Sequence, residues 1–220
     1  MGAGFPGEKA LARQLAGSGL GLAEALAKVE AQEGRAGLVA RVETLLSTSE
    51  AAPGAFHHDA VQRFPIIFTT AWDDLFERAA AAAGVEAVVS WRGEPFPEPE
   101  EGRLKIHHLW GGFAGPQGPA LTAQDRRDCP PPSDEQRYWR HLLRAHVALF
   151  AGFRPDEGEF EVLFDELVAG YGGALPRTHW AVAQGRISDV QWQKWVWRGM
   201  LLFTADPSEV TQNLAEQLDA

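Results

Sequence analysis

The apolar run from Ile66 to Phe68 predicts a short, buried β-strand. Two threonines end the run, and a helix is predicted to follow over residues 73–83, with carboxylates in its first turn and Gly84 as its C-terminal stop. A strand that runs directly into a helix is half of a βαβ unit. Because ligands of open parallel sheets bind beyond the carboxyl ends of the strands, the turn after Phe68 is the first candidate site.

The hydrophobic pattern of the remaining chain alternates between strands and helices. Further strands are predicted over residues 86–91, 104–107, 145–153, 179–182 and 200–203. Helices are predicted over residues 9–16, 22–31, 37–46, 134–144, 159–169 and 207–218. Polar, turn-rich loops are expected over residues 93–102 and 125–133, and the loop over 111–119 is expected to be mobile or to wrap a ligand.

This alternation predicts an α/β fold, in which a Rossmann-like parallel sheet carries helices on both faces. A small helical N-terminal portion is expected over residues 1–50, and the sheet over residues 51–220. We expect the two parts to form a single domain over residues 1–220, since a chain of 220 residues is long enough to bury one substantial core.

Composition and charge narrow the classes of function. The net charge of −10 disfavours a nucleic-acid backbone as the main partner. The single cysteine, Cys129, excludes an internal disulfide and any four-cysteine zinc site. The sequence shows no secretory signal and no apolar run of membrane-spanning length, so a cytoplasmic protein without a membrane partner is expected.

Five short motifs along the chain carry polar residues or glycines, most of them at the ends of predicted elements. They are Thr-Thr-Ala-Trp-Asp-Asp-Leu-Phe-Glu at 69–77, Lys-Ile-His-His at 105–108, a Leu-Thr pair followed by aspartate at 121–125, Leu-Phe-Ala-Gly-Phe-Arg at 149–154, and Gly-Phe-Pro at 4–6. Together these segments resemble the sirtuin-like family of NAD-binding domains, especially its bacterial branch in anti-phage defence proteins.

The resemblance implies NAD as the ligand and cleavage of the bond between nicotinamide and ribose as the reaction. It makes His107 the candidate base and Asp73 the group that orients the ribose or the nicotinamide. Contacts to NAD are expected from the strand ends and from the glycine-containing N-terminus, at Thr69, Thr70, Gly152, Phe153, Arg154 and Gly4. ADP-ribose is the alternative nucleotide partner.

Departures from the family pattern leave two interpretations of the function open. The asparagine that the family places in the first motif is Ala71 here, which has no side-chain donor or acceptor. The glycine after the motif histidine is His108, and the family's serine is Arg154. If Ala71 is an engineered replacement, the protein is an NAD glycohydrolase silenced at that position. If Ala71 is natural, the protein is a catalytically dead module that binds a nucleotide or another protein.

The family's first strand and its glycine-rich loop have no clear counterpart, since only Gly-Ala-Gly at residues 2–4 resembles the loop. A sheet without that strand would present unpaired backbone groups at an edge. We therefore expect a homo-oligomer or a protein partner. Protein deacylation is disfavoured, because the zinc ribbon of classical deacylases cannot be built from one cysteine.

Each candidate residue also has a structural interpretation. His107 on an apolar strand could be a buried structural histidine, and Asp73 could serve only the helix N-terminus. Arg154 could be a solvated loop residue. Adjacent histidines on a strand point to opposite faces, so no metal site is expected at His107 and His108.

Overall fold

The computed structural model describes residues 8–17, 19–47, 51–94, 102–128, 133–153, 158–183, 187–205 and 209. The chain divides into two compact units, Met1–Pro131 and Pro132–Ala220, which are described here one at a time. That the two units form a single domain stays a prediction. The predicted fold class is confirmed: the elements are those of an α/β fold with parallel sheets, flanking helices and a helical N-terminal portion.

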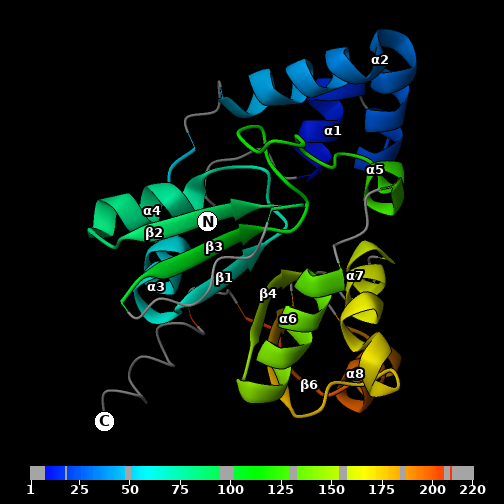
Figure 1. Ribbon diagram of the computed structural model, residues 1–220. Helices are drawn as coiled ribbons and strands as arrows, with labels where there is room; N and C mark the ends of the chain where they lie inside the picture. Colours follow the sequence, from blue (N-terminus) through cyan, green and yellow to red (C-terminus); the bar gives the residue numbers. More distant parts are fainter. Residues whose placement is uncertain are drawn as a thin grey trace. The chain divides into compact units, whose positions relative to one another are not determined.

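The first unit contains a parallel sheet of three strands (Figure 1). Its strands are β1 (Ile66–Thr69), β2 (Ala87–Trp91) and β3 (Leu104–His108), in the order β1-β3-β2. Residue Thr69 of β1 and Trp91 of β2 both pair with His108 of β3. The three carboxyl ends therefore finish at the same level of one sheet edge, which is where ligands of parallel sheets bind.

Two helices pack on this sheet and form its core. They are α3 (Ala55–Arg63) and α4 (Leu75–Ala83), and α4 ends at Gly84, whose φ of 68° is left-handed. The core joins apolar residues of both helices to residues of the sheet: Ala60, Val61, Ile67, Ala79, Ala80, Leu104 and Ile106. The helix stop predicted at Gly84 is confirmed, because glycine adopts this backbone conformation without a steric cost.

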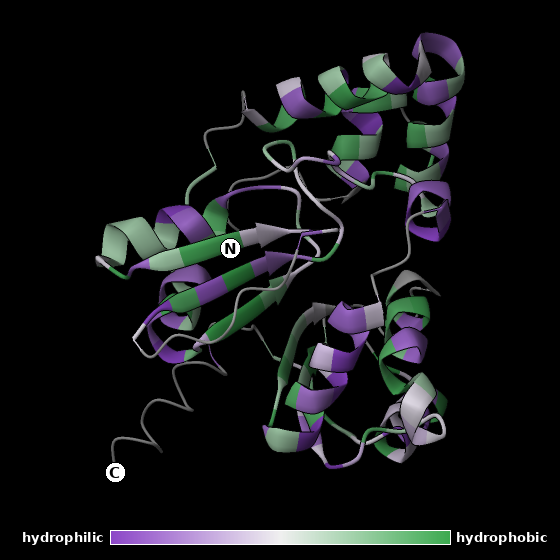
Figure 2. Cartoon of the chain, viewed as in Figure 1, coloured by the Kyte–Doolittle hydropathy of each residue, from purple (hydrophilic) through white to green (hydrophobic). Residues whose placement is uncertain are grey.

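The N-terminal helices have a core of their own. They are α1 (Glu8–Ala16) and α2 (Leu22–Ser47), and they bury Leu11, Leu15, Leu26, Val29, Leu38 and Val42 together with Leu121. Figure 2 shows the alternation of hydrophobic and hydrophilic residues along α2. The two helices predicted over 22–31 and 37–46 are separated by a break at Gly34, whose φ of 73° and ψ of 175° are not helical.

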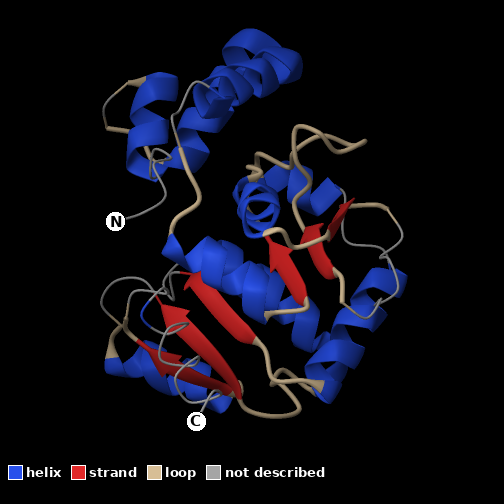
Figure 3. Cartoon of the chain, turned by 90° about the vertical axis from the view of Figure 1, so that its left-hand side faces the viewer, coloured by secondary structure: helices blue, strands red, loops and turns tan. Residues whose placement is uncertain are grey.

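The second unit contains another parallel sheet of three strands. Its elements are α6 (Ser133–Ala145), β4 (Leu149–Phe153), α7 (Gly158–Val168), η1 (Ala169–Tyr171), β5 (His179–Ala183), α8 (Asp189–Trp197) and β6 (Met200–Phe203). The strand order is β4-β5-β6, with helices alongside the strands in Figure 3. Phe160 and Phe164 of α7 pack against the fully buried ring of Trp195 on α8, at centroid distances of 5.3 and 5.1 Å.

Several predicted elements were wrong in extent or absent. The strand predicted over 145–153 begins only at Leu149, because α6 continues to Ala145. A short helix, α5 (Ala123–Asp128), lies where the polar loop over 125–133 was expected. Helix α8 was missed, although Ser188 and Gln191 form a capping box that marks its start. Except for residue 209, the helix predicted over 207–218 lies outside the described residues.

Candidate functional site

The turn that follows β1 is shaped by its own side chains. The buried Thr69 accepts a hydrogen bond at Oγ1 from the amide of Ala71, at 3.0 Å, and its carbonyl accepts one from the amide of Leu109, at 2.8 Å. Asp73 accepts a hydrogen bond at Oδ1 from the amide of Leu75, at 3.1 Å. Helix α4 begins at Leu75, two residues later than predicted. The Asp73 carboxylate satisfies the free backbone amide of this first helical residue.

His108 connects this turn to both β2 and α4. Its side chain is buried; Nδ1 lies 3.1 Å from the carbonyl oxygen of Ala71, and Nε2 lies 2.6 Å from Oε1 of Glu77. The ring stacks on Trp91, with the centroids 4.3 Å apart and the planes 23° apart. Because a carbonyl oxygen only accepts, Nδ1–H of His108 is the donor to Ala71, and Nε2 faces the carboxyl group of Glu77.

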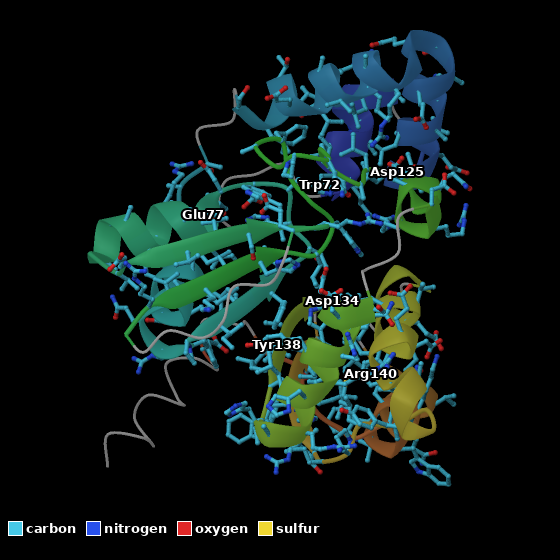
Figure 4. All side chains as sticks on the ribbon, in the orientation of Figure 1. Trp72, Glu77, Asp125, Asp134, Tyr138 and Arg140 are labelled. Atoms are coloured by element: carbon cyan, nitrogen blue, oxygen red, sulfur yellow. The ribbon has the colours of Figure 1, made fainter. Side chains whose placement is uncertain are left out.

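The importance of His108 and Glu77 was missed in the sequence. The sequence presents His108 as the replacement of a family glycine and as one of two adjacent histidines, and Glu77 as the last residue of the first motif. The positions of the two residues in their elements are informative: Glu77 lies in the first turn of α4, and His108 pairs with the last residue of β1, which leads into that helix. Figure 4 labels Glu77, which projects from α4.

His107 lies on the opposite face of β3 from His108, because successive side chains of a strand alternate. It is fully buried, its Nδ1 lies 2.8 Å from Oγ of Ser90, and its ring meets the ring of Phe68 edge-on at 5.9 Å. These contacts are separate from those of the turn around Asp73. The role of His107 as a base stays a prediction.

Asp73 has an electrostatic environment that suits proton transfer. Burial raises the pKa of Asp73 above its ordinary value, and the negative charges of Glu77 and Asp74 raise it further. The hydrogen bond from the Leu75 amide and the proximity of His108 act in the opposite direction. A carboxyl with a raised pKa at a strand–helix turn is a candidate acid or base, since such groups work best near the operating pH.

The loop after β3 is packed against Trp91. A side chain at Gly112 would overlap the Trp91 ring, and a Cβ at Gly115 would lie 3.1 Å from the same ring. Gly111, with a φ of 67°, approaches the backbone of Gly118 so closely that a side chain would not fit. The close approach of the backbone to the indole explains Gly112 and Gly115.

Other predicted site residues lie in the second unit or outside the described residues. Gly152, with a φ of 79°, lies at a bulge near the end of β4, and Phe153 is the last residue of that strand. Gly4 and Arg154 lie outside the described residues. Their roles stay predictions.

Within the described ranges, no group of three histidine, cysteine, aspartate or glutamate side chains is placed to hold a metal ion. In the same ranges, no helix is long and apolar enough to cross a membrane. Trp72, labelled in Figure 4, packs against the core of α1 and α2. Its role is therefore to anchor the turn to the N-terminal helices.

Comparison with known families identifies the domain. The sequence model of the SIR2-like domain matches residues 65–202, from the residue before β1 into β6. The chain belongs to the SIR2-like domain family. No curated protein matches the chain. The matched segment includes the turn at 69–73, both histidines of β3 (His107 and His108) and the end of β4.

Proposed function

We propose that this SIR2-like domain binds NAD or ADP-ribose at the carboxyl edge of the β1-β3-β2 sheet. We further propose that its reaction is cleavage of the bond between nicotinamide and ribose. The observation that supports this most is the turn at the end of β1, where Asp73 has a raised pKa beside Thr69 and Thr70, inside the segment matched by the family. Nucleotides bind at this kind of edge in parallel sheets.

The chemistry asks for groups that hold the ribose and move a proton. Cleavage of a bond to ribose passes through an oxocarbenium-like state, which a nearby carboxylate stabilises. Asp73 would hold the ribose, and the hydroxyl of Thr70 would add a polar contact at the strand end. His107 would act as the base, held in its orientation by Ser90.

Ala71 favours a second candidate function, nucleotide binding without hydrolysis. Its side chain can neither donate nor accept, and its carbonyl is already engaged by His108. Residue 71 therefore has no side-chain group that could position the ribose or a water molecule. In this case the domain would act by binding NAD, ADP-ribose or a partner protein.

Nicotinamide release by the chain as written and by Ala71→Asn separates these functions. We expect the Ala71→Asn variant to release nicotinamide faster, because the amide restores a donor and an acceptor at the turn. Ala82→Asn, on the exposed face of α4, is the matched control and should not change the rate. Calorimetric titration with NAD and ADP-ribose measures binding in all three proteins.

Each outcome has a clear meaning. If neither the wild type nor Ala71→Asn releases nicotinamide but both bind NAD, the hydrolase function is rejected and the nucleotide-binding function is kept. Rapid turnover by the chain as written rejects the binding-only function. Absence of both turnover and nucleotide binding rejects the proposal as a whole.

The resemblance to the anti-phage branch supports a further part of the proposal. We propose that the domain works in the cytoplasm of a bacterium, in a defence system, as a homo-oligomer or with a protein partner. Light scattering of the purified protein tests the oligomer. A strictly monomeric particle that gains no partner on nucleotide binding would contradict it.

A further inference from the structure

Arg92 is a buried cation at the proposed nucleotide edge. It follows β2 directly, and only 5% of its surface is exposed. Its backbone amide donates a hydrogen bond to the carbonyl of His108, at 3.1 Å, which ties it to the carboxyl end of β3. Arg92 therefore lies at the same sheet edge as the turn after β1.

The side chain of Arg92 has no acidic partner among the described residues. Its Nη2 lies 3.4 Å from the carbonyl oxygens of Asp125 and of Arg126, a long distance for a hydrogen bond. No carboxylate in the described ranges forms an ion pair with Arg92. The guanidinium group has five N–H donors, so these two weak contacts use little of its capacity.

Arg35 in the same unit shows how this chain normally satisfies an arginine. Arg35 contacts the carboxylate of Asp125 at 2.8 Å and that of Glu30 at 3.6 Å, and it donates to the carbonyl of Pro119 at 2.8 Å. The Asp125 carboxylate also accepts from the amide of Thr122, at 2.7 Å. This acid, labelled in Figure 4, is therefore already occupied and leaves Arg92 only its backbone oxygen.

A buried guanidinium without a counter-ion carries a large desolvation cost. Arginine keeps its charge under all ordinary conditions, so it cannot relieve this cost by losing a proton. Buried charges in proteins are therefore paired, or they meet a charged ligand. The location of Arg92 at the carboxyl edge of a parallel sheet points to the ligand.

We propose that Arg92 binds a phosphoryl group of the nucleotide. The planar guanidinium matches phosphate oxygens in a two-bond geometry, and the enclosed position strengthens the attraction. The net charge of −10 repels anions, so an anionic ligand needs a local cation of this kind. That the anion belongs to a nucleotide rests on the proposed function; that Arg92 needs an anion does not.

Ligand-dependent stability of Arg92→Met tests the proposal. ADP-ribose carries the phosphoryl groups, adenosine carries none, and inorganic pyrophosphate carries them without a nucleoside. We expect Arg92→Met to weaken ADP-ribose binding at least about tenfold and to leave adenosine binding unchanged. Arg103→Met is the matched control, because Arg103 is exposed at the opposite end of β3, where it pairs with Glu86.

The unliganded protein supplies an independent readout. We expect the melting temperature of ligand-free Arg92→Met to equal or exceed that of the wild type, because the change removes a buried charge that has no acidic partner among the described residues. If Arg92→Met does not fold, or melts at a lower temperature, Arg92 is structural and the proposal is overturned. Arg92→Lys, which keeps the charge without the planar fork, should retain part of the ADP-ribose affinity.

The acidic segment after β2 is the competing partner. We expect a variant with Gln at Glu98, Glu100 and Glu101 to keep its melting temperature and its affinity for ADP-ribose. A marked loss of stability in this variant would assign the chain's own carboxylates to Arg92 and overturn the proposal.

The two proposals fail in different ways. Equal ADP-ribose affinity in the wild type and Arg92→Met rejects the role of Arg92 and leaves nucleotide binding intact. If no nucleotide binds but pyrophosphate stabilises the wild type and not Arg92→Met, the proposed function fails and the anion site stands. If pyrophosphate and ADP-ribose both leave the wild type unchanged, both proposals are rejected.

Discussion

Replacing Glu77 with leucine deprives the buried His108 of the carboxylate oxygen that lies 2.6 Å from its Nε2. The His108 side chain is 1% exposed and that of Glu77 is 20% exposed, so water cannot fully replace the lost partner. An unsatisfied buried donor and a lost charge-assisted hydrogen bond each cost about 1–3 kcal/mol. With partial access of water to Glu77, we expect Glu77→Leu to lower the free energy of unfolding by about 2 kcal/mol.

A double-mutant cycle isolates the contact from the loss of side-chain packing. The single variants Glu77→Leu and His108→Leu and the double variant give the coupling energy, which we expect to be about 1–2 kcal/mol. The control is the exposed pair of Asp74, the N-cap of α4, and Arg78 on α4, where the atoms are 3.8 Å apart and the side chains are 65% and 46% exposed. Exposed pairs of this kind contribute about 0–0.5 kcal/mol.

Urea unfolding, read by hydrogen exchange of the β3 amides, reports the first unit alone. This matters because the chain has two compact units, and if they unfold separately a single global transition mixes two stabilities. If the coupling of Glu77 and His108 does not exceed that of the control pair, the buried contact does not hold the turn. The assignment of His108 as the link between β3 and α4 would then be refuted.

Three further predictions follow from single contacts. Gly112→Ala should destabilise the first unit by about 1–3 kcal/mol in urea unfolding, because the new methyl group overlaps the Trp91 ring. Asp73→Asn should stabilise the protein at neutral pH, because a raised carboxyl pKa means that the charged form of Asp73 destabilises the folded state. In urea unfolding at a series of pH values, this gain in stability should vanish as the pH falls to the unfolded pKa of 3.8. Burial and the charge of Arg177 lower the pKa of His179, so the folded second unit should lose stability as the pH falls through the unfolded value of 6.5. His179→Asn should remove this loss when acid unfolding is monitored by circular dichroism. An acid transition that is the same in His179→Asn and in the wild type would contradict the prediction.

The sequence determined most of the local structure. Short segments built around apolar residues specify the strands at 66–69, 87–91, 104–108, 179–183 and 200–203, because apolar side chains form the core of a parallel sheet. Glycine at residue 84 specifies the end of α4 for an equally local reason, its freedom to adopt positive φ. Helix α8 is not among the predicted helices, although the capping box of Ser188 and Gln191 is a local signal for its start.

The candidate site was determined only in part by the sequence. The turn around Ala71 and Asp73 was recognisable, because it follows a strand and precedes a helix. The alternation of a strand shows that His107 and His108 face opposite ways, but it does not say which of them meets α4. The tertiary structure decides this, because Glu77 and Trp91 come from other elements and reach His108 only when β2, β3 and α4 pack together. The lack of an acidic partner for Arg92 among the described residues has the same origin: a charge is visible in the sequence, while its burial and its surroundings exist only in the fold.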